Sequence, residues 1–191
     1  ALVIESGGST FEEATTIKTV SSIRLYDIDA DGKSEIFIDG KAADGSTMTH
    51  AFKFDGELSA CSFGESDYAS GAVKEFTHSK LYLKRTVDIL GTYTAEVGYT
   101  YSGGAFKNDS PILKLSGTSY VTTSKDLTLA DGKIIPSGYK LKFTETDGSS
   151  YIDFTTDQGL TGKIAIKKAE SGWTINGNAD TSYFESLPYK K

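Results

Sequence analysis

Acidic side chains recur at alternate positions of one short loop, and they are the residues best suited to chemistry in this sequence. Asp27, Asp29 and Asp31 stand at positions one, three and five of the loop, and Gly32 follows at position six. Calcium takes roughly six to eight oxygen ligands, and a chain supplies several of them when carboxylates alternate in a loop that glycine allows to fold back. The spacing therefore predicts a calcium site.

Two further ligands are expected from the same loop, and its flanks decide what kind of site it is. The carbonyl of Lys33 stands at position seven and Glu35 at position nine. An EF-hand would carry a bidentate glutamate at position twelve, between two helices. Ile38 occupies that position, and the flanking residues alternate as strands do. The loop is therefore not an EF-hand, and its expected ion is structural, joining two strands rather than taking part in catalysis.

The same loop has a second interpretation, in which it is a solvated acidic turn without an ion. Aspartate and glycine are good turn-forming residues, so the pattern alone does not require a cation. However, three like charges within five residues repel one another, and a divalent cation would remove that electrostatic cost. Both interpretations are kept, with bound calcium preferred.

Catalytic chemistry has little support elsewhere in the sequence. The histidines are His50 and His78 and the single thiol is Cys61, and a cysteine–histidine pair would need the two side chains to be adjacent in the fold. The sequence has no Gly-x-Ser-x-Gly, no His-Glu-x-x-His and no glycine-rich phosphate loop. Acidic residues are numerous enough to supply a glycosidase pair, but such sites need a deep cleft that small hairpin domains rarely form. We therefore expect a protein that is not an enzyme.

The elements that must position the acidic loop are strands. The 191 residues include 20 glycines and three prolines. Asp-Gly or Asn-Gly pairs recur between alternating segments, which is the strongest local signal for hairpins. The pattern predicts an all-β fold with strands at residues 22–26, 35–39, 49–54, 81–87, 93–101, 139–144, 151–155 and 162–167. One helical turn is expected within residues 178–187.

Charge and composition limit the classes of partner and the location that are expected. The formal net charge of −6 and the pI near 5.0 argue against a nucleic-acid partner, because phosphate binding needs clustered lysine and arginine. No apolar run approaches the ~20 residues that span a bilayer, so the chain is expected not to cross a membrane. One cysteine excludes an internal disulfide. We expect an extracellular or cell-surface location, with any secretory signal or lipid anchor already removed.

Residues 23–38 resemble the FG-GAP/VCBS repeat of integrin-type propellers and of many secreted bacterial proteins. The resemblance implies a calcium-carrying strand–loop–strand unit, with Glu35 standing where aspartate is common. Its implied ligands are Asp27, Asp29, Asp31 and Glu35. Separately, segments 51–58 and 98–106 resemble each other at an offset of 47 residues, as expected either for propeller blades or for two unrelated hairpins. Residues 1–116 are therefore expected to form a VCBS/FG-GAP-like β domain with an antiparallel sheet like a propeller blade.

Residues 118–168 are similar to bacterial SH3-like domains in the order of their expected strands. The match departs from that family at Lys163, where tryptophan is usual, and the family's early Asn-Val-Arg-Ser-Gly-Pro segment is absent. The resemblance implies a small barrel with a C-terminal tail over residues 117–191, of the kind that binds cell-wall peptide or glycan through exposed aromatic rings. The rings that could bind a ligand, or could equally be core residues, are Tyr139, Tyr151, Trp173 and Tyr189.

The combination of a VCBS-like unit with an SH3-like domain resembles secreted or surface proteins of Firmicutes. This resemblance implies a location more directly than an activity. We expect a non-catalytic, calcium-stabilised extracellular binding module that attaches to cell-wall peptidoglycan or to a surface glycan or peptide. The alternative is a protein–protein interaction ectodomain or an accessory region of a larger surface assembly. A hydrolase is a distant third.

Overall fold

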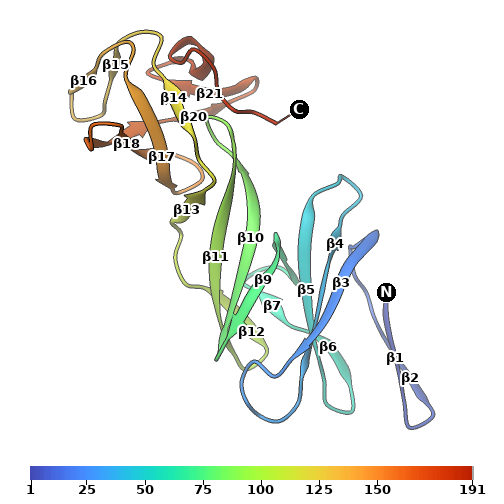
Figure 1. Ribbon diagram of the computed structural model, residues 1–191. Helices are drawn as coiled ribbons and strands as arrows, with labels where there is room; N and C mark the ends of the chain where they lie inside the picture. The colour runs from blue at the N-terminus through green and yellow to red at the C-terminus, as the bar shows by residue number, and fades with distance from the viewer. Residues whose placement is uncertain (191) are drawn as a thin grey trace. The chain divides into compact units, whose positions relative to one another are not determined.

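The computed structural model describes residues 1–190, and within them the protein is all-β, which confirms the predicted fold class. Figure 1 shows the strands in chain order. The helical turn expected within residues 178–187 is a short 3-10 helix, η1 (Asp180–Ser182). None of the sheets in the described part of the chain closes into a barrel. The finer assignment to a propeller-blade-like sheet and an SH3-like barrel therefore remains a proposal.

Each of the eight predicted strands overlaps a strand of the structure. Residues 162–167 are the one segment that is divided, because its two ends belong to different strands on either side of Ile166. The structure also contains short strands that the sequence did not predict, in particular an N-terminal hairpin of β1 (Leu2–Ser6) and β2 (Ser9–Glu13).

The chain divides into two compact units, which are described separately. Unit 1 comprises residues 1–85 and 97–110, and unit 2 comprises residues 86–96 and those from 111 onward. Strands β10 (Lys80–Asp88) and β11 (Thr92–Ser102) contribute to both units. The single boundary near residue 116 that the sequence indicated stays a prediction.

Unit 1 is built around a five-stranded antiparallel sheet. Its order is β3-β4-β5-β6, and β8 pairs with the other end of β5. The bounds of these strands are β3 (Thr19–Tyr26), β4 (Glu35–Lys41), β5 (Thr47–Phe54), β6 (Leu58–Ala60) and β8 (Tyr68–Ser70). Besides the β1–β2 hairpin, the remaining strands of this unit are β7 (Ser62–Phe63), β9 (Ala72–Thr77), β12 (Ala105–Asn108) and parts of β10 and β11.

Strand β4 is buried on both faces, because separate apolar groups cover the two sides of the sheet. Phe37 belongs to a core that includes Leu81, Leu83 and Phe106. Alternate side chains of the strand, including Ile36, point into a second core against which the β1–β2 hairpin packs. The hairpin residues in that core are Leu2, Ile4 and Phe11. The first residue of β4, Glu35, is thereby placed at the buried end of a central strand.

Unit 2 shows the alternation that the sequence predicted. In β17 (Lys140–Thr146), Leu141 and Phe143 are fully buried whereas Lys140 is exposed. This strand pairs with β13 (Leu113–Ser116), β14 (Tyr120–Thr122) and β18 (Tyr151–Thr156), and β18 pairs with β19 (Thr161–Ala165). The smaller sheets of this unit are formed by β15 (Leu127–Thr128), β16 (Ile134–Ile135), β20 (Lys167–Ala169), β21 (Gly172–Ile175) and β22 (Asn178–Ala179).

Candidate functional site

The acidic loop connects β3 to β4, as the sequence predicted, and Asp27 organises its turn. Residues Tyr26 and Glu35 are direct cross-strand partners, so the loop closes a hairpin. Asp27 accepts hydrogen bonds from the backbone N–H of Asp31, through Oδ1 at 3.1 Å, and of Gly32, through Oδ2 at 2.9 Å. Gly32 has φ +87°, a left-handed conformation that other residues rarely adopt, and this lets the chain turn back toward β4.

Three carboxylates converge inside this turn. One oxygen each of Asp27, Asp29 and Glu35 lies within 4.8 Å of the other two, which is a spacing at which a single cation could contact all three. Asp31 is outside this group, and its Oδ1 accepts a hydrogen bond of 2.8 Å from the backbone N–H of Lys33. Exposed acidic groups are common without an ion, so the convergence is compatible with calcium and does not demonstrate it.

Glu35 is the residue of this cluster whose environment differs most from water. It is only 4% exposed, and burial raises the pKa of its carboxyl because the charged form loses solvation. A hydrogen bond of 3.1 Å from the backbone N–H of Ile28 to Oε2 acts in the opposite direction, and the charges of Asp29 and Asp31 raise the pKa further. The ionised Glu35 would therefore gain from a compensating positive charge.

Two lysine side chains, Lys33 and Lys53, lie beside this cluster. A small cavity of about 110 Å³ beside the loop is lined by Glu35, by Lys33 and Lys53, and by Tyr101 of β11. The ammonium of Lys33 forms an ion pair of 2.6 Å with Asp55, which raises the pKa of Lys33 through the hydrogen bond and the charge of that partner. Because the Lys33 ammonium is paired with Asp55, it forms no ion pair with the three converging carboxylates.

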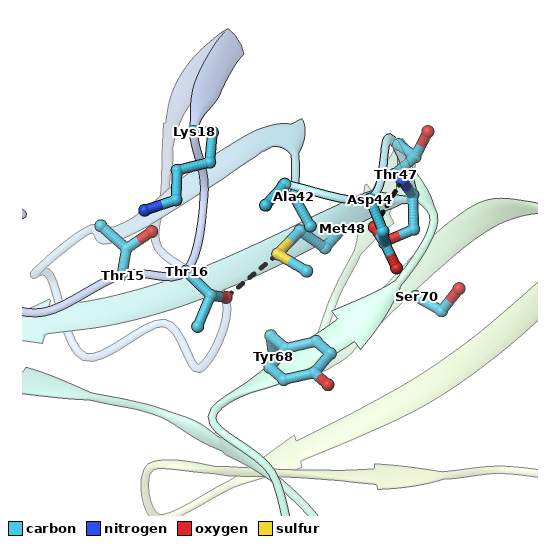
Figure 2. A pocket seen from close by; sticks show the side chains of 11 residues that line it. Thr15, Thr16, Lys18, Ala42, Asp44, Thr47, Met48, Tyr68 and Ser70 are labelled. Atoms are coloured by element: carbon cyan, nitrogen blue, oxygen red, sulfur yellow. Dashed lines mark hydrogen bonds between the residues drawn. The ribbon is translucent and has the colours of Figure 1, made fainter.

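A second candidate site in unit 1 is an open pocket of about 740 Å³ over β5 and β8, which the sequence did not indicate. Met48, 5% exposed, lies at its base, and Tyr68, 38% exposed, presents its ring on one side. Figure 2 shows Met48 between Lys18 and Asp44, with Thr16 and Tyr68 below it. The lining is mostly hydroxyl-bearing or small, and its residues are Thr15, Thr16, Lys18, Ala42, Ala43, Asp44, Ser46, Thr47, Met48, Tyr68 and Ser70.

His50 supports this pocket from within the sheet. It is fully buried, and its Nε2 lies 3.0 Å from Thr16 Oγ1, which itself donates a hydrogen bond of 3.2 Å to Met48 Sδ. In the contact between Thr16 and Nε2, the direction of the hydrogen bond depends on which ring nitrogen of His50 carries the proton. The other ring nitrogen, Nδ1, is buried and has no hydrogen-bond partner. Burial lowers the pKa of the imidazole, and the charge of Asp67 opposes that shift.

The aromatic residues predicted to bind a ligand all belong to unit 2, where Tyr151, Trp173 and Tyr189 have different partners. Trp173 is buried, and its Nε1 donates a hydrogen bond of 2.8 Å to the carbonyl of Asp88. Tyr139 and Tyr151 are half-buried. The Lys163 ammonium nitrogen lies 3.3 Å from the centroid of the Tyr151 ring. The hydroxyl of Tyr189 donates a hydrogen bond of 2.5 Å to Asp180, and burial raises its pKa. None of the four lines the open pocket of about 420 Å³ beside β18 and β19.

The thiol and the exposed histidine that the sequence offered for catalysis have different environments. Cys61 is fully buried, and burial raises the pKa of its thiol to about 11, so little thiolate exists near neutral pH. His78 is exposed. The one hydrogen bond that affects the Cys61 pKa comes from a tyrosine, Tyr101.

The pocket residues of unit 1 were missed because they are distant in the sequence and carry no recognisable motif. Thr16 precedes β3, Met48 is in β5 and Tyr68 is in β8. The only local signal was the turn at Asp44-Gly45, which sequence reasoning used for a hairpin and not for a site.

Within residues 1–190, no helix has the length and apolar character that crossing a membrane requires. Searches with this chain find no matching family model, no matching curated protein and no matching solved structure.

Proposed function

We propose that this protein is a non-catalytic extracellular binding module in which calcium joins the ends of β3 and β4. The observation that carries the proposal is the convergence of the Asp27, Asp29 and Glu35 carboxylates within 4.8 Å. Asp31, which lies outside this group in the structure, and the carbonyl of Lys33 are the further ligands of the proposal. The FG-GAP/VCBS-like sheet and the SH3-like barrel are part of the same proposal.

The proposed calcium has a mechanical role. Asp27 follows the last residue of β3 and Glu35 is the first residue of β4, so an ion held by both would fix the two strand ends against one another. It would also compensate the charge of Glu35, which is almost fully buried. The ion would therefore add to stability rather than take part in catalysis.

The proposed ligand is a neutral or zwitterionic chain such as a cell-wall or surface glycan or peptide, and the open pocket of unit 1 is the place that supports it best. Its volume of about 740 Å³ suits a small segment of such a ligand. Tyr68 offers a ring against which a sugar or peptide plane can stack, while the threonine and serine hydroxyls offer hydrogen bonds. Lys18 and Asp44 balance one another's charge, which disfavours strongly charged ligands.

Calcium binding is tested by thermal unfolding of the chelated protein with and without added calcium. We expect calcium to raise Tm in the wild type and to have no effect on Asp29→Ala, since this removes one of the three converging oxygens without opening the core. Asp44→Ala is the matched control, because it removes an exposed carboxylate of a different turn. An equal calcium response in wild type and Asp29→Ala would refute the proposed site.

Ligand binding is tested by sedimentation with purified peptidoglycan and by a surface glycan array. Tyr68→Ala should abolish retention if the pocket of unit 1 is the site, whereas Tyr189→Ala should abolish it if the aromatic residues predicted in unit 2 are the site. Wild-type protein that neither sediments with peptidoglycan nor binds a glycan would contradict attachment as the function.

The alternative function, a module for protein contacts, is supported by a different observation. Ile23 and Leu25 of β3 are 59% and 67% exposed, although both are large aliphatic residues in a strand. Exposed apolar side chains that adjoin one another on a sheet are typical of surfaces that contact other proteins.

A further inference from the structure

Strand β3 forms an open edge of the five-stranded sheet. Within residues 1–190 it pairs only with β4, so its outer edge has no strand partner. An open edge offers backbone N–H and C=O groups to a further strand. The β1–β2 hairpin covers the neighbouring side chains of β4, but it leaves Ile23 and Leu25 of β3 mostly exposed.

The exposed aliphatic side chains of β3 lie on one face. Ile23 pairs with Ile38 and Leu25 pairs with Ile36, and both partners belong to the core beneath the hairpin. Because directly opposed residues point to the same face, Ile23 and Leu25 extend that core to the edge of the sheet. Val20, 55% exposed and opposite Gly40, continues the same row beyond a bulge at Ser21.

The edge has few of the features that normally prevent strand pairing. Arg24 is the one charged residue of β3, and charged residues on an edge usually repel an added strand. Here its guanidinium is turned back across the sheet, where NH1 lies 2.6 Å from Asp39 Oδ2 and 3.2 Å from the carbonyl of Val73. The bulge at Ser21 is confined to one end, so residues 22–26 form a regular segment.

The two ends of β3 carry opposite charge. Lys18 immediately precedes the strand and Lys41 is opposite Thr19, and together they outnumber Asp44 beside them, so the first end is net basic. The acidic loop that begins at Asp27 makes the other end acidic. A second β3 placed in parallel would bring like charges together, whereas an antiparallel one would bring each basic end against an acidic loop.

We propose that the β3 edge is a self-association surface, on which a second copy of this chain adds its own β3 antiparallel and related by a two-fold axis near Ile23. From that centre, Asp27 of each copy reaches the Lys18–Thr19 end of the other. The two exposed aliphatic rows then join on one face of a sheet that runs continuously through both copies. The inference goes beyond the proposed function and requires neither calcium nor a glycan.

The first test is the molar mass of the full chain as a function of concentration, in chelator and at low salt. A single edge buries little surface, so we expect a weak dimer that forms between about 10 µM and 1 mM. Leu25→Lys should weaken dimerisation by about tenfold or more, because it places a charge in the joined aliphatic row. Val3→Lys is the matched control, since Val3 is a 52% exposed aliphatic residue of β1 that lies outside the surface.

Charge and register are tested separately. Lys18→Glu should weaken the dimer at low salt, and roughly 1 M salt, which reduces the Debye length to about 3 Å, should weaken the wild type. Ile23→Cys should form an intermolecular disulfide on oxidation, because the two copies of residue 23 face one another at the axis. Val3→Cys should not, and buried Cys61 gives little background.

The possible results separate self-association from other uses of the edge. A wild type that remains monomeric at about 1 mM overturns the proposal. A dimer that Leu25→Lys does not weaken, or an Ile23→Cys variant that stays uncrosslinked in a dimerising sample, also overturns it. A peptide from another protein that protects β3 amides from hydrogen exchange, while the chain alone stays monomeric, would assign the edge to a different partner. None of these results depends on whether Asp29→Ala abolishes the calcium response.

Discussion

His50 Nε2 lies 3.0 Å from Thr16 Oγ1, so a fully buried imidazole holds the segment that enters β3 against the floor of the unit 1 pocket. The same ring packs against Phe52 and Tyr68, with centroid separations of 5.9 and 5.7 Å. A protonated imidazole would have a buried charge at Nδ1, where no acceptor is present to receive its proton.

This arrangement predicts acid sensitivity. The pKa of folded His50 is lowered below its ordinary value of 6.5, so the unfolded state binds the proton more readily. The stability contributed by neutral His50 is therefore fully present above about pH 6.5 and is lost as the pH falls from there through the folded pKa. Urea unfolding at pH 7.5 and pH 5 should show a larger loss for the wild type than for His50→Gln.

The matched control for that measurement is His78→Gln, which changes an exposed histidine. It should retain the wild-type pH dependence between pH 7.5 and pH 5. A His50→Gln variant with the same loss of stability as the wild type would show that another group causes it.

The network around Asp39 predicts a large loss of stability on its removal. The carboxylate is 3% exposed and accepts hydrogen bonds from Arg24, Ser22, Thr49 Oγ1 at 2.7 Å and the backbone N–H of Val73 at 3.0 Å. Asp39→Ala leaves several of these donors without a partner, and we expect unfolding free energy to fall by about 3 kcal/mol or more. Chemical denaturation measures the change.

Removing the exposed Lys133–Asp131 pair by Lys133→Ala is the control for the Asp39 variant and should leave stability unchanged. A comparable loss there would contradict the role given to burial.

Glu35→Gln should change the stability of the protein in opposite directions with and without calcium. The folded pKa of Glu35 is raised, so the calcium-free protein loses stability as pH rises from the ordinary glutamate value of 4.5 through the folded pKa. Glu35→Gln removes this titration, so the chelated variant should be at least as stable as the chelated wild type at pH 7. With calcium added, the order should reverse, because the variant lacks a charged ligand. Differential scanning calorimetry in chelator and in calcium measures both, and a variant that responds to calcium like the wild type would remove Glu35 from the site.

Ile17 and the backbone of Thr19 approach Gly40 so closely that we expect even the methyl group of alanine to be unfavourable there. A Cβ on Gly40 would lie 2.4 Å from Ile17 Cγ2 and 2.5 Å from the carbonyl oxygen of Thr19, and the latter is backbone that cannot rotate away. Gly40→Ala should therefore cost about 1–3 kcal/mol of unfolding free energy through overpacking. Hydrogen exchange should show the loss of protection first in β3, which this contact holds against β4. Unchanged protection in β3 would contradict the contact.

Local patterns were sufficient for the fold class and for the main strands. A hairpin forms through interactions between residues that are close in the sequence. Both the alternation in β17 and the Asp-Gly turns between strands are patterns of this local kind. The strand–loop–strand arrangement around Asp27 was predicted for the same reason, because its Asx hydrogen bonds to Asp31 and Gly32 join close neighbours in the chain.

Contacts between distant segments decided the rest. The burial of Glu35, the separation of Asp31 from the converging carboxylates and the pocket formed by Thr16, Met48 and Tyr68 all depend on which strands pack together. Residue order and alternation do not specify those pairings, because an apolar residue that alternates correctly can face the core or, like Leu25, solvent. The type of each element follows from local physical chemistry, whereas its neighbours and its buried charges follow from the tertiary packing.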